Sequence, residues 1–354
     1  MVLAVVICIA GLTYIYVGYP VLIWVLARMC TRAGVRRGGG GALQCSVVIA
    51  AYHEGLALNR KVESILQSRD LDAVREIVIG LDGPPIEGDP TSEQLELIAR
   101  HKVEDSDKRG GSGRIPRIRV VSFPERRGKA ALLCELVPMA SADILVMMDA
   151  RQVIHPEAIR QLLANFTDES VGVVSGELVF VSGKEPPVPG VVQQGVGVYW
   201  LYEKFIRRCE GRFRSVPGAT GALYAIRRNL FRPIPAGTLL DDVAIPMQAV
   251  EQGSRCVFEP GAEVYDAPAE TAGREAVRKR RTIAGVVQLM CIYPRWMLPW
   301  HNPIWFEYVS HKLLRLCSPL LLAGLLISNL MVLAQPAFQL LLALQGVFYL
   351  LALG

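Results

Sequence analysis

The chain has 354 residues, enough for one large domain with additional segments. Hydrophobic residues make up 51%, charged residues make up 20%, and the mean hydropathy is +0.31. Soluble domains usually carry about 25% charged residues, so this composition favours membrane segments and excludes a disordered chain. The net charge of +5 is too small for this length to indicate nucleic acid as a partner. The eight cysteines form no CxxC pair, so we expect neither a zinc site nor a disulfide framework.

The first apolar segment covers residues 2–27 and contains no charged residue. It is long enough to cross a bilayer core of roughly 30 Å. Arg28, Arg32, Arg36 and Arg37 follow it directly, which by the positive-inside rule puts the N-terminus outside and the following chain in the cytoplasm. The segment has neither a charged start nor a cleavage site of small residues, so we expect an uncleaved anchor over residues 1–28.

Two further apolar runs end the chain, within residues 312–354. Lys312 and Arg315 mark a cytoplasmic start, and Gln335-Pro336 interrupts the apolar sequence. This pattern predicts a transmembrane hairpin and, with the anchor, a multi-pass protein of the cell membrane.

The stretch before the hairpin, residues 291–311, is rich in aromatic side chains. Trp296, Trp300 and Trp305 lie within ten residues of one another. Because indole rings favour the headgroup region, we expect an interfacial segment on the membrane surface in contact with lipids. The alternative is an aromatic cluster in the protein core.

Residues 42–290 lie between the anchors and alternate strand signals with helix signals. Continuous apolar runs predict strands that are buried on both faces, and helical spacing predicts the segments between them. The expected strands are 44–51, 74–81, 117–123 and 143–148, and the expected helices are 55–68, 91–103 and 128–140. This order predicts an α/β domain with a mostly parallel, doubly wound, Rossmann-like sheet in the cytoplasm.

Acidic residues follow three of the expected strands. Glu54, Asp82 and Asp149 come at the carboxyl ends of strands, where ligands bind to open α/β sheets. Converging carboxylates repel one another unless a cation or a ligand donor lies between them. No Walker-A loop and no GxGxxG motif is present, so we expect the segment Arg126–Lys129, at the start of a helix, to hold phosphate.

A set of short motifs carries a resemblance to a known family. In order, these are Ser46–Glu54, Asp82-Gly83, Gly128-Lys129, Asp149, Gly218–Arg228 and Asp241-Asp242. The set resembles the membrane-integrated family 2 glycosyltransferases of GT-A fold, which include cellulose, hyaluronan and poly-N-acetylglucosamine synthases. The resemblance implies an inverting enzyme that transfers a sugar from a nucleotide sugar, expected to be UDP-linked, to a glycan or lipid-linked acceptor at the cytoplasmic membrane face.

The resemblance also assigns a donor site. Ala51, Tyr52, Glu54 and Asp82 would hold uracil and ribose, and Lys129 would contact the base or the diphosphate.

The expected metal site departs from the family pattern. Asp149 would be the first acid of the DxD-type motif that binds the diphosphate with Mg²⁺ or Mn²⁺, but Arg151 replaces the second acid. A hard divalent ion prefers several oxygen ligands, so phosphates and water would have to complete the site, or Arg151 would offset the phosphate charge itself.

The resemblance places the catalytic base at Asp242. An acceptor hydroxyl must lose its proton opposite the leaving diphosphate, and a carboxylate with a tuned pKa suits that role. The adjacent Asp241 could raise this pKa or orient the loop. Asp242 also fits an N-cap of the expected helix 243–251, and the two roles are compatible.

The acceptor-side element of the family matches Gly218, Ala219, Thr220 and Gly221, since glycine lets a sugar approach the backbone closely. The alternative is an ordinary turn into a strand.

Arg281 matches the arginine of the family's Gln-x-x-Arg-Trp motif, where it would hold the leaving diphosphate. Arg278 replaces the glutamine and Thr282 the tryptophan of that motif, which argues against processive polymer synthesis. A basic patch facing the membrane is the alternative and could coexist with the catalytic role.

A second functional class also fits the sequence. A membrane-anchored pseudoenzyme that binds a nucleotide sugar, as a sensor or assembly partner, would explain the altered metal and arginine motifs. Such a protein would have no need of a base at Asp242.

Overall fold

The computed structural model describes residues 1–30, 43–84, 116–181, 198–267 and 271–353. The expected helix over 91–103 and the arginines at 32, 36 and 37 lie outside these ranges. Within them, an eight-stranded sheet forms the centre of the molecule, in the order β3-β2-β1-β4-β7-β6-β8-β5. The strands are β1 (Cys45–Ala51), β2 (Val74–Leu81), β3 (Arg117–Ser122), β4 (Ile144–Asp149), β5 (Val153–Ile154), β6 (Val171–Phe180), β7 (Leu223–Arg227) and β8 (Arg255–Asp266).

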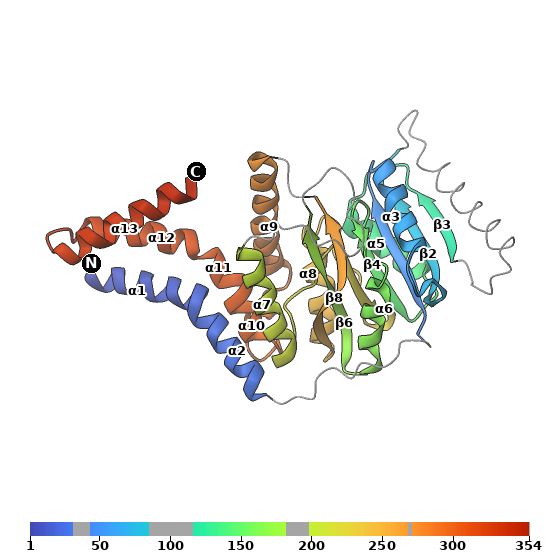
Figure 1. Ribbon diagram of the computed structural model, residues 1–354, viewed down its shortest axis with the longest axis horizontal. Helices are drawn as coiled ribbons and strands as arrows, with labels where there is room; N and C mark the ends of the chain where they lie inside the picture. The colour runs from blue at the N-terminus through green and yellow to red at the C-terminus, as the bar shows by residue number, and fades with distance from the viewer. Residues whose placement is uncertain (31–42, 85–115, 182–197, 268–270, 354) are drawn as a thin grey trace.

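Helices cover both faces of this sheet (Figure 1). They are α3 (Leu56–Leu66), α5 (Lys129–Leu136), α6 (Ala158–Ala164), α7 (Val198–Phe213), α8 (Asp241–Glu251) and α9 (Ala272–Ile292). Single turns of 3₁₀-helix lie at Leu71–Ala73, Val137–Met139, Asn165–Thr167, Arg228–Leu230 and Pro294–Met297.

The expectation of a mostly parallel sheet is confirmed with two exceptions. Because β6 pairs with β8 in parallel and β7 is antiparallel to both of its neighbours, six of the eight strands run in one direction, and β5 and β7 run opposite to them. Strands β3, β2, β1 and β4 are mutually parallel, as the apolar runs predicted. Strand β7 then runs antiparallel to both β4 and β6, and β5 runs antiparallel to β8, so the sheet is mixed. The reversal at β7 has a structural consequence: Leu223 at its start pairs with Met148 near the end of β4. The residues that precede β7 therefore lie at the same sheet edge as the ends of the parallel strands.

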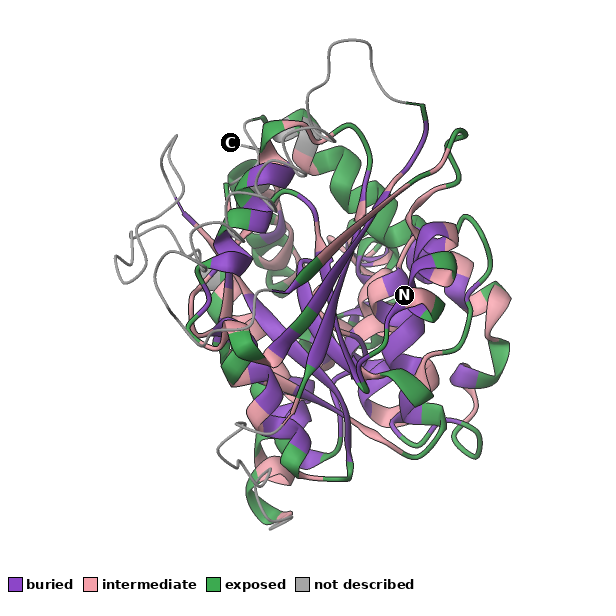
Figure 2. Ribbon diagram, turned by 90° about the vertical axis from the view of Figure 1, so that its right-hand side faces the viewer, coloured by how far each residue is buried: buried purple, intermediate pink, exposed green. Residues whose placement is uncertain are grey.

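Alternating side chains of the buried strands enter two separate cores. On β1, Val47 and Ile49 pack with Leu58 of α3, whereas Val48 packs on the opposite face with Leu132 of α5 and Ile245 of α8. Both faces of the central strands are therefore buried, and Figure 2 shows these buried strands between helices that carry both buried and exposed residues. This burial explains why the strands are continuous apolar runs in the sequence.

The N-terminal apolar segment is one continuous helical stretch, Val2–Met29, with a mean hydropathy of 2.1 and 22% of its most apolar window buried. It consists of α1 (Val2–Thr13), a π-helical turn (Tyr14–Gly18) and α2 (Tyr19–Met29). Among the described residues it is the one helix long and apolar enough to cross a membrane by itself.

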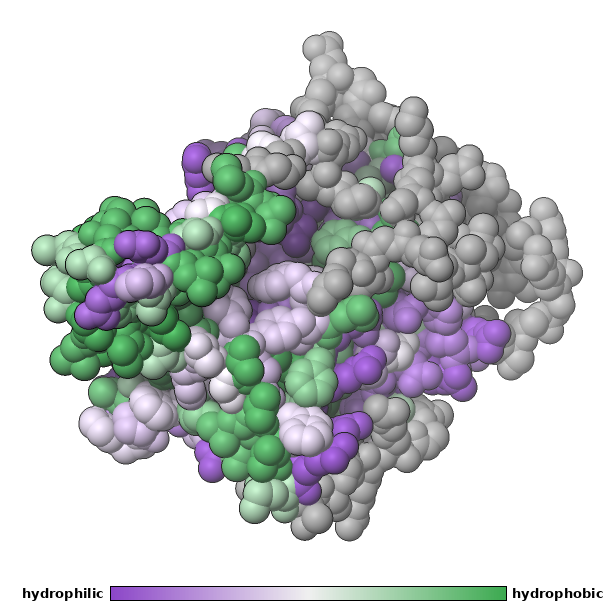
Figure 3. Space-filling view, turned by 60° about the vertical axis from the view of Figure 1, so that its left-hand side comes forward, coloured by the Kyte–Doolittle hydropathy of each residue, from purple (hydrophilic) through white to green (hydrophobic). Residues whose placement is uncertain are grey.

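The C-terminal apolar runs form a bent helix pair and a shorter helix. The pair, Trp305–Leu316 and Ser318–Leu330, bends by 52° and would count as a second span if it acts as one. Its parts are α10 (Trp305–Glu307), the π-helical turn η7 (Tyr308–Leu313), α11 (Leu314–Leu316) and α12 (Ser318–Leu330), and α13 (Pro336–Leu353) follows. Apolar residues gather over the N- and C-terminal helices at the left of Figure 3.

The three tryptophans before the C-terminal helices have different surroundings. Trp296 is 1% exposed, stacks on Tyr293 with ring centroids 4.1 Å apart, and belongs to the core on the α5 and α8 side of the sheet. Trp305 donates a hydrogen bond from Nε1 to the carbonyl of Met297 at 2.8 Å. Trp300, in contrast, is 73% exposed. The core alternative thus describes Trp296, and an interfacial position remains a prediction for Trp300.

Candidate active site

The ends of three parallel strands meet at one sheet edge, as the strand order predicted. In the pairing register, Ala50 lies beside Asp149 and Ala51 lies beside Leu81, which precedes Asp82. Ala51 itself is buried and ends β1. The candidate donor residues therefore lie together at the carboxyl edge of the sheet.

Asp82 holds the turn that precedes α5. Its two carboxylate oxygens accept hydrogen bonds from the backbone N–H groups of Arg127 at 2.6 Å and Gly128 at 2.8 Å. Gly128 has a φ of +84°, a conformation that favours glycine, and it caps the start of α5. The buried Asp82 carboxylate thus positions the segment Arg126–Lys129, a role that the sequence analysis did not anticipate.

Lys129 joins two carboxylates from different elements. Its Nζ lies 2.7 Å from Asp149 Oδ1 and 2.8 Å from Asp241 Oδ2. Burial by itself would lower the pKa of Lys129, but these two carboxylates raise it well above its ordinary value. The lysine therefore stays charged and offsets the acidic cluster at this edge.

Asp242 lies against the glycine-rich segment. A Cβ atom built on Gly221 would come within 3.2 Å of Asp242 Oδ2, so only glycine leaves the carboxylate its present space. The backbone N–H of Ala219 donates to the carbonyl of Asp242 at 2.7 Å. Burial and the neighbouring Asp241 raise the pKa of Asp242 to about 6, against the opposing effect of Lys129.

The expected N-cap role of Asp242 is wrong. Helix α8 begins at Asp241 with Leu240 at the cap position, and Asp242 lies inside the first turn without a side-chain capping bond. The carboxylate is consequently available for another partner.

Thr220 is held by an arginine that the sequence analysis missed. Arg207 of α7 donates to Thr220 Oγ1 at 2.8 Å and to Ser175 Oγ at 2.7 Å, and the N–H of Thr220 donates to the same Ser175 hydroxyl at 2.9 Å. Gly218 has a φ of +115° and packs against Val243 of α8. These contacts hold the segment Gly218–Gly221 beside Asp242. The segment also leads directly into β7, which agrees with the alternative of a turn into a strand.

An aromatic stack lies at the outer end of β1. The rings of Tyr52 and His53 stack with centroids 4.1 Å apart, and the Arg126 guanidinium lies 4.0 Å from the Tyr52 ring centroid. Tyr52 is 39% exposed, so this stack offers a flat surface of the kind on which a nucleobase rests.

Arg151 pairs with an acid outside the expected motif. Its guanidinium lies 3.6 Å from Asp266 Oδ2 at the end of β8, and Gln152 also donates to that oxygen at 3.1 Å. Burial raises the pKa of the half-buried Glu54, and Arg151 opposes this effect. Asp266 was missed because no strand was predicted there.

The fit of a divalent cation depends on Asp149. In the described ranges no group of three acidic, histidine or cysteine side chains is close enough to hold a metal ion. Asp149 Oδ1 accepts from Lys129, and its carboxylate is part-exposed at the strand end. Magnesium is commonly held by one or two carboxylates together with substrate phosphates, so Asp149 fits a cation that is shared with a diphosphate.

Arg281 contacts the segment before the two aspartates. Its Nη2 donates to the carbonyl of Leu239 at 3.3 Å, while the side chain is otherwise exposed. Gln288, about two turns further along α9 on the same face, accepts from the N–H of Leu239 at 2.9 Å and donates to the carbonyl of Gly237 at 3.0 Å. Through these contacts, helix α9 holds the segment from Gly237 to Leu239, which leads into Asp241 and Asp242. Arg278 instead lies over the ring of Phe180, and Arg280 is exposed.

Two further buried groups face the acidic cluster. The Nζ of Lys61 on α3 is buried without a hydrogen-bond partner in the described part of the chain, and burial lowers its pKa to about 7 against Asp149 and Asp266. The hydroxyl of Tyr224 on β7 is also buried without such a partner, and burial and Asp241 raise its pKa. Lys61 lies in a helix with an ordinary amphipathic pattern, so the sequence does not indicate that its ammonium is buried near these carboxylates.

Comparison with solved structures places this arrangement in a known fold. A mannosyltransferase from Pyrobaculum calidifontis, PcManGT, solved in complex with GDP-Man and Mn²⁺, superposes with a TM-score of 0.74 at 20% identity, covering 98% of this chain and 92% of that one. GalNAc-T7, solved with UDP, GalNAc and Mn²⁺, covers 64% of this chain and 44% of its own at 19% identity, and its TM-score of 0.44 is too low to support an argument.

The sequence itself was compared with curated proteins and with family models. No curated protein matches the chain. The model of the family described as glycosyltransferase like family 2 matches residues 43–285, which include every candidate site residue named above. The match and the shared GT-A-like fold support a glycosyltransferase enzyme, and the chain belongs to glycosyltransferase family 2.

Proposed function

We propose that this enzyme transfers a sugar, with inversion, from a nucleoside diphosphate sugar to an acceptor hydroxyl at the cytoplasmic membrane face. The observation that carries the proposal is the environment of Asp242. Its carboxylate has a pKa raised to about 6 and lies beside a glycine segment that a sugar can approach. The carboxylates of Asp149 and Asp241 are compensated by Lys129, whereas Asp242 forms no ion pair with any residue of the described ranges.

The reaction follows from this arrangement. Asp242 accepts the proton of the acceptor hydroxyl while the acceptor oxygen forms a bond to the anomeric carbon. The bond from that carbon to the diphosphate breaks, and its electron pair leaves with the nucleoside diphosphate. Negative charge then develops on the leaving diphosphate. Lys129, which pairs with Asp241, and Arg281, which contacts Leu239, supply positive charge that offsets it.

A divalent cation belongs to the same proposal. Asp149 would hold Mg²⁺ or Mn²⁺ together with oxygens of the diphosphate. The cation would stabilise the charge of the leaving diphosphate. The reported complex of PcManGT contains Mn²⁺, which supports including a metal but does not choose between the two ions.

The proposed base site suits either uracil or guanine. The expectation of a UDP-sugar came from the resemblance, whereas PcManGT was solved with GDP-Man. The stack of Tyr52, His53 and Arg126 suits either base because every nucleobase has a flat aromatic face.

Attachment to the membrane is supported by the terminal helices. The helix Val2–Met29 is apolar throughout its spanning length, and Arg28 lies at its end. Lys312 and Arg315 lie in the first part of the bent helix pair. These positions support a multi-pass protein with residues 42–290 on the cytoplasmic side, where the acceptor would be a glycan or a lipid-linked molecule.

A donor panel tests the proposal. Full-length protein in lipid nanodiscs is incubated with UDP- and GDP-sugars and a membrane lipid extract, with Mg²⁺, with Mn²⁺ or with EDTA, and release of nucleoside diphosphate is measured. We expect release with one donor, loss of release in EDTA, and no release by an Asp242→Asn variant. Donor binding without release under any condition would instead support the nucleotide-sugar-binding sensor.

A further inference from the structure

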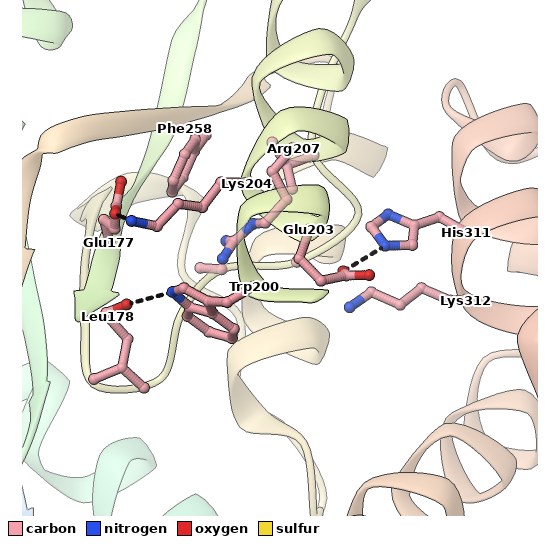
Figure 4. A pocket seen from close by; sticks show the side chains of 12 residues that line it. Glu177, Leu178, Trp200, Glu203, Lys204, Arg207, Phe258, His311 and Lys312 are labelled. Carbon is pink, nitrogen blue, oxygen red and sulfur yellow. Dashed lines mark hydrogen bonds and ion pairs between the residues drawn. The ribbon is translucent and has the colours of Figure 1, made fainter. Parts of the chain in front are cut away.

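A cavity of about 110 Å³ lies between the catalytic domain and the C-terminal apolar helices. Helix α7 contributes Arg207, the turn η7 contributes Lys312, and Gly218 and Ala219 form the wall toward the active site. Figure 4 shows side chains of α7 and of η7 pointing toward one another across this space. None of the motifs that indicate a glycosyltransferase explains these cations.

Most charged side chains around the cavity are paired. Lys204 forms an ion pair with Glu177, and Glu203 binds both Arg315 and His311, the latter at 3.1 Å. Burial alone would raise the pKa of Glu203. Its interactions with His311 and Arg315 instead lower this pKa to about 2, so the carboxylate is ionised and bound to these two residues. These carboxylates form their hydrogen bonds and ion pairs with residues other than Arg207 and Lys312. Glu203, Glu210 and Asp242 attract the two cations only over a longer distance.

Arg207 and Lys312 lack such a carboxylate partner in the described part of the chain. The guanidinium of Arg207 donates only to the hydroxyls of Thr220 and Ser175 and lies 4.8 Å from the ring centroid of Phe258. No hydrogen bond or ion pair of the described residues involves the ammonium of Lys312. Arg207 and Lys312 are half-buried and close enough to repel each other. Such a pair is costly unless an anion compensates it, so the two cations point to an anionic ligand.

The cavity has the active site on one side and apolar helices on the other. Ala219 lines the cavity and is bonded through its N–H to the carbonyl of Asp242. Lys312 belongs to the helix pair that continues into α12, where Leu320 is 74% exposed and Ile327 is 61% exposed. A ligand that reaches from Asp242 through the cavity to these helices must therefore have a polar end at Asp242, an anionic group beside Arg207 and Lys312, and an apolar end along the helices.

We propose that this cavity binds a phosphate group of a lipid-linked acceptor, with Arg207 and Lys312 as its ligands. This inference rests on the proposed transferase function, because it places the acceptor hydroxyl at Asp242 and the lipid along the terminal helices. Arginine and lysine are both suited to phosphate, the first through its planar fork and the second as a point charge.

Binding of a long-chain alkyl phosphate tests the site directly. The affinity of full-length protein in nanodiscs for dodecyl phosphate is measured, with dodecanol and inorganic phosphate as the other probes. We expect dodecyl phosphate to bind at least tenfold more tightly than either, since lipid and phosphate both contribute. Equal affinity for inorganic phosphate would contradict a lipid-linked ligand, and equal affinity for dodecanol would contradict a phosphate subsite.

Variants identify the cations. Lys312→Gln should weaken dodecyl phosphate binding about tenfold or more, the scale of one charge-assisted hydrogen bond. Lys279→Gln removes the same charge from exposed α9, outside the cavity, and should change the affinity less than twofold. Arg207→Lys keeps a charge but loses the fork, and should give an intermediate loss. Equal weakening by Lys279→Gln would mean general attraction to a basic surface and would overturn the assignment.

Donor binding separates this inference from the transferase proposal. Lys312→Gln should leave the affinity for the nucleotide sugar unchanged, because Lys129 and Asp82 of the proposed donor site do not line this cavity. If nucleoside diphosphate is released with a neutral glycan acceptor and dodecyl phosphate does not bind, the subsite is wrong and the transferase stands. If dodecyl phosphate binding depends on Lys312 but no donor is turned over, the subsite stands and the transferase proposal fails.

Discussion

The ammonium of Lys129 lies 2.7 Å from the carboxylate of Asp149, and this ion pair joins the start of α5 to the end of β4. The same nitrogen lies 2.8 Å from Asp241, the residue before the proposed base. One cation thus connects the expected diphosphate side of the site with its catalytic side. Changes at Lys129 should consequently affect the protonation of Asp242.

The pH dependence of kcat/KM should show this coupling. Asp242 acts as a base only when ionised, so kcat/KM of the wild type should rise with pH through about 6 and level off above it. Lys129 lowers the pKa of Asp242, so Lys129→Gln should raise that pKa and move the rising limb to higher pH. Lys129→Arg, which keeps the charge, should leave the limb near its original position. An unshifted limb in an active Lys129→Gln variant would show that Asp242 is not the titrating group.

The turn held by Asp82 should govern both stability and donor binding. Asp82→Ala removes two hydrogen bonds to a carboxylate, and the loss should be about 1.5–3 kcal/mol in the free energy of unfolding. The segment Arg126–Lys129 should then move, and donor affinity should fall. Thermal unfolding and donor titration measure the two effects. Asp82→Asn keeps one acceptor oxygen and should lie between Asp82→Ala and the wild type; unchanged donor affinity in both variants would contradict this role.

A single methyl group should disturb the proposed base. Gly221→Ala would place Cβ 3.2 Å from Asp242 Oδ2 and force the carboxylate to shift. We expect kcat to fall about tenfold or more with donor affinity unchanged, because misplacement acts on the reaction step. Gly273→Ala on α9 is the matched control and should be neutral, because its Cβ would come no closer than 3.9 Å to Thr271 Oγ1, its nearest neighbour among the described residues. Equal kcat values in the two variants would count against the position assigned to Asp242.

Two arginines of α9, Arg280 and Arg281, should have different functions. Arg281 contacts the carbonyl of Leu239 and should be needed for transfer, so Arg281→Ala should lower kcat by about an order of magnitude. In the described part of the chain, the exposed Arg280 makes no hydrogen bond to that segment, and Arg280→Ala should mainly weaken association with anionic lipid in a salt-dependent way. Turnover assays and vesicle binding measure the two effects. Full turnover in Arg281→Ala with loss in Arg278→Ala would show that the motif was aligned in the wrong register.

The sequence predicted the first four strands of the chain well and the later strands poorly. The strands expected at 44–51, 74–81 and 143–148 correspond to Cys45–Ala51, Val74–Leu81 and Ile144–Asp149, because strands buried on both faces are apolar throughout. Strand β8 was missed because it contains Pro260 and Gly261 among polar residues, and the direction of β7 depends on tertiary pairing. The sheet is mixed because β7 and β5 run opposite to the other six strands.

Part of the site could be predicted and part could not. Asp82, Asp149 and Asp242 stand in short motifs that end strands or precede a helix, so their type and position were visible. Arg207 and Lys312 lie in helical segments far apart in the chain, and only the packing of α7 against the terminal helices brings them to one cavity. The partner of Arg151, Asp266, was likewise hidden because it ends an unpredicted strand.

Asp242→Asn provides the most direct measurement, with donor affinity and transfer rate determined on the same preparation. Asparagine has nearly the shape of aspartate but cannot accept the acceptor proton at neutral pH, and that proton is removed only in the transition state. We expect donor affinity within about twofold of the wild type and transfer reduced by a factor on the order of 10²–10⁴. Transfer at the wild-type rate, or a loss of donor affinity that accounts for the whole loss of transfer, would contradict the assignment of Asp242 as the catalytic base.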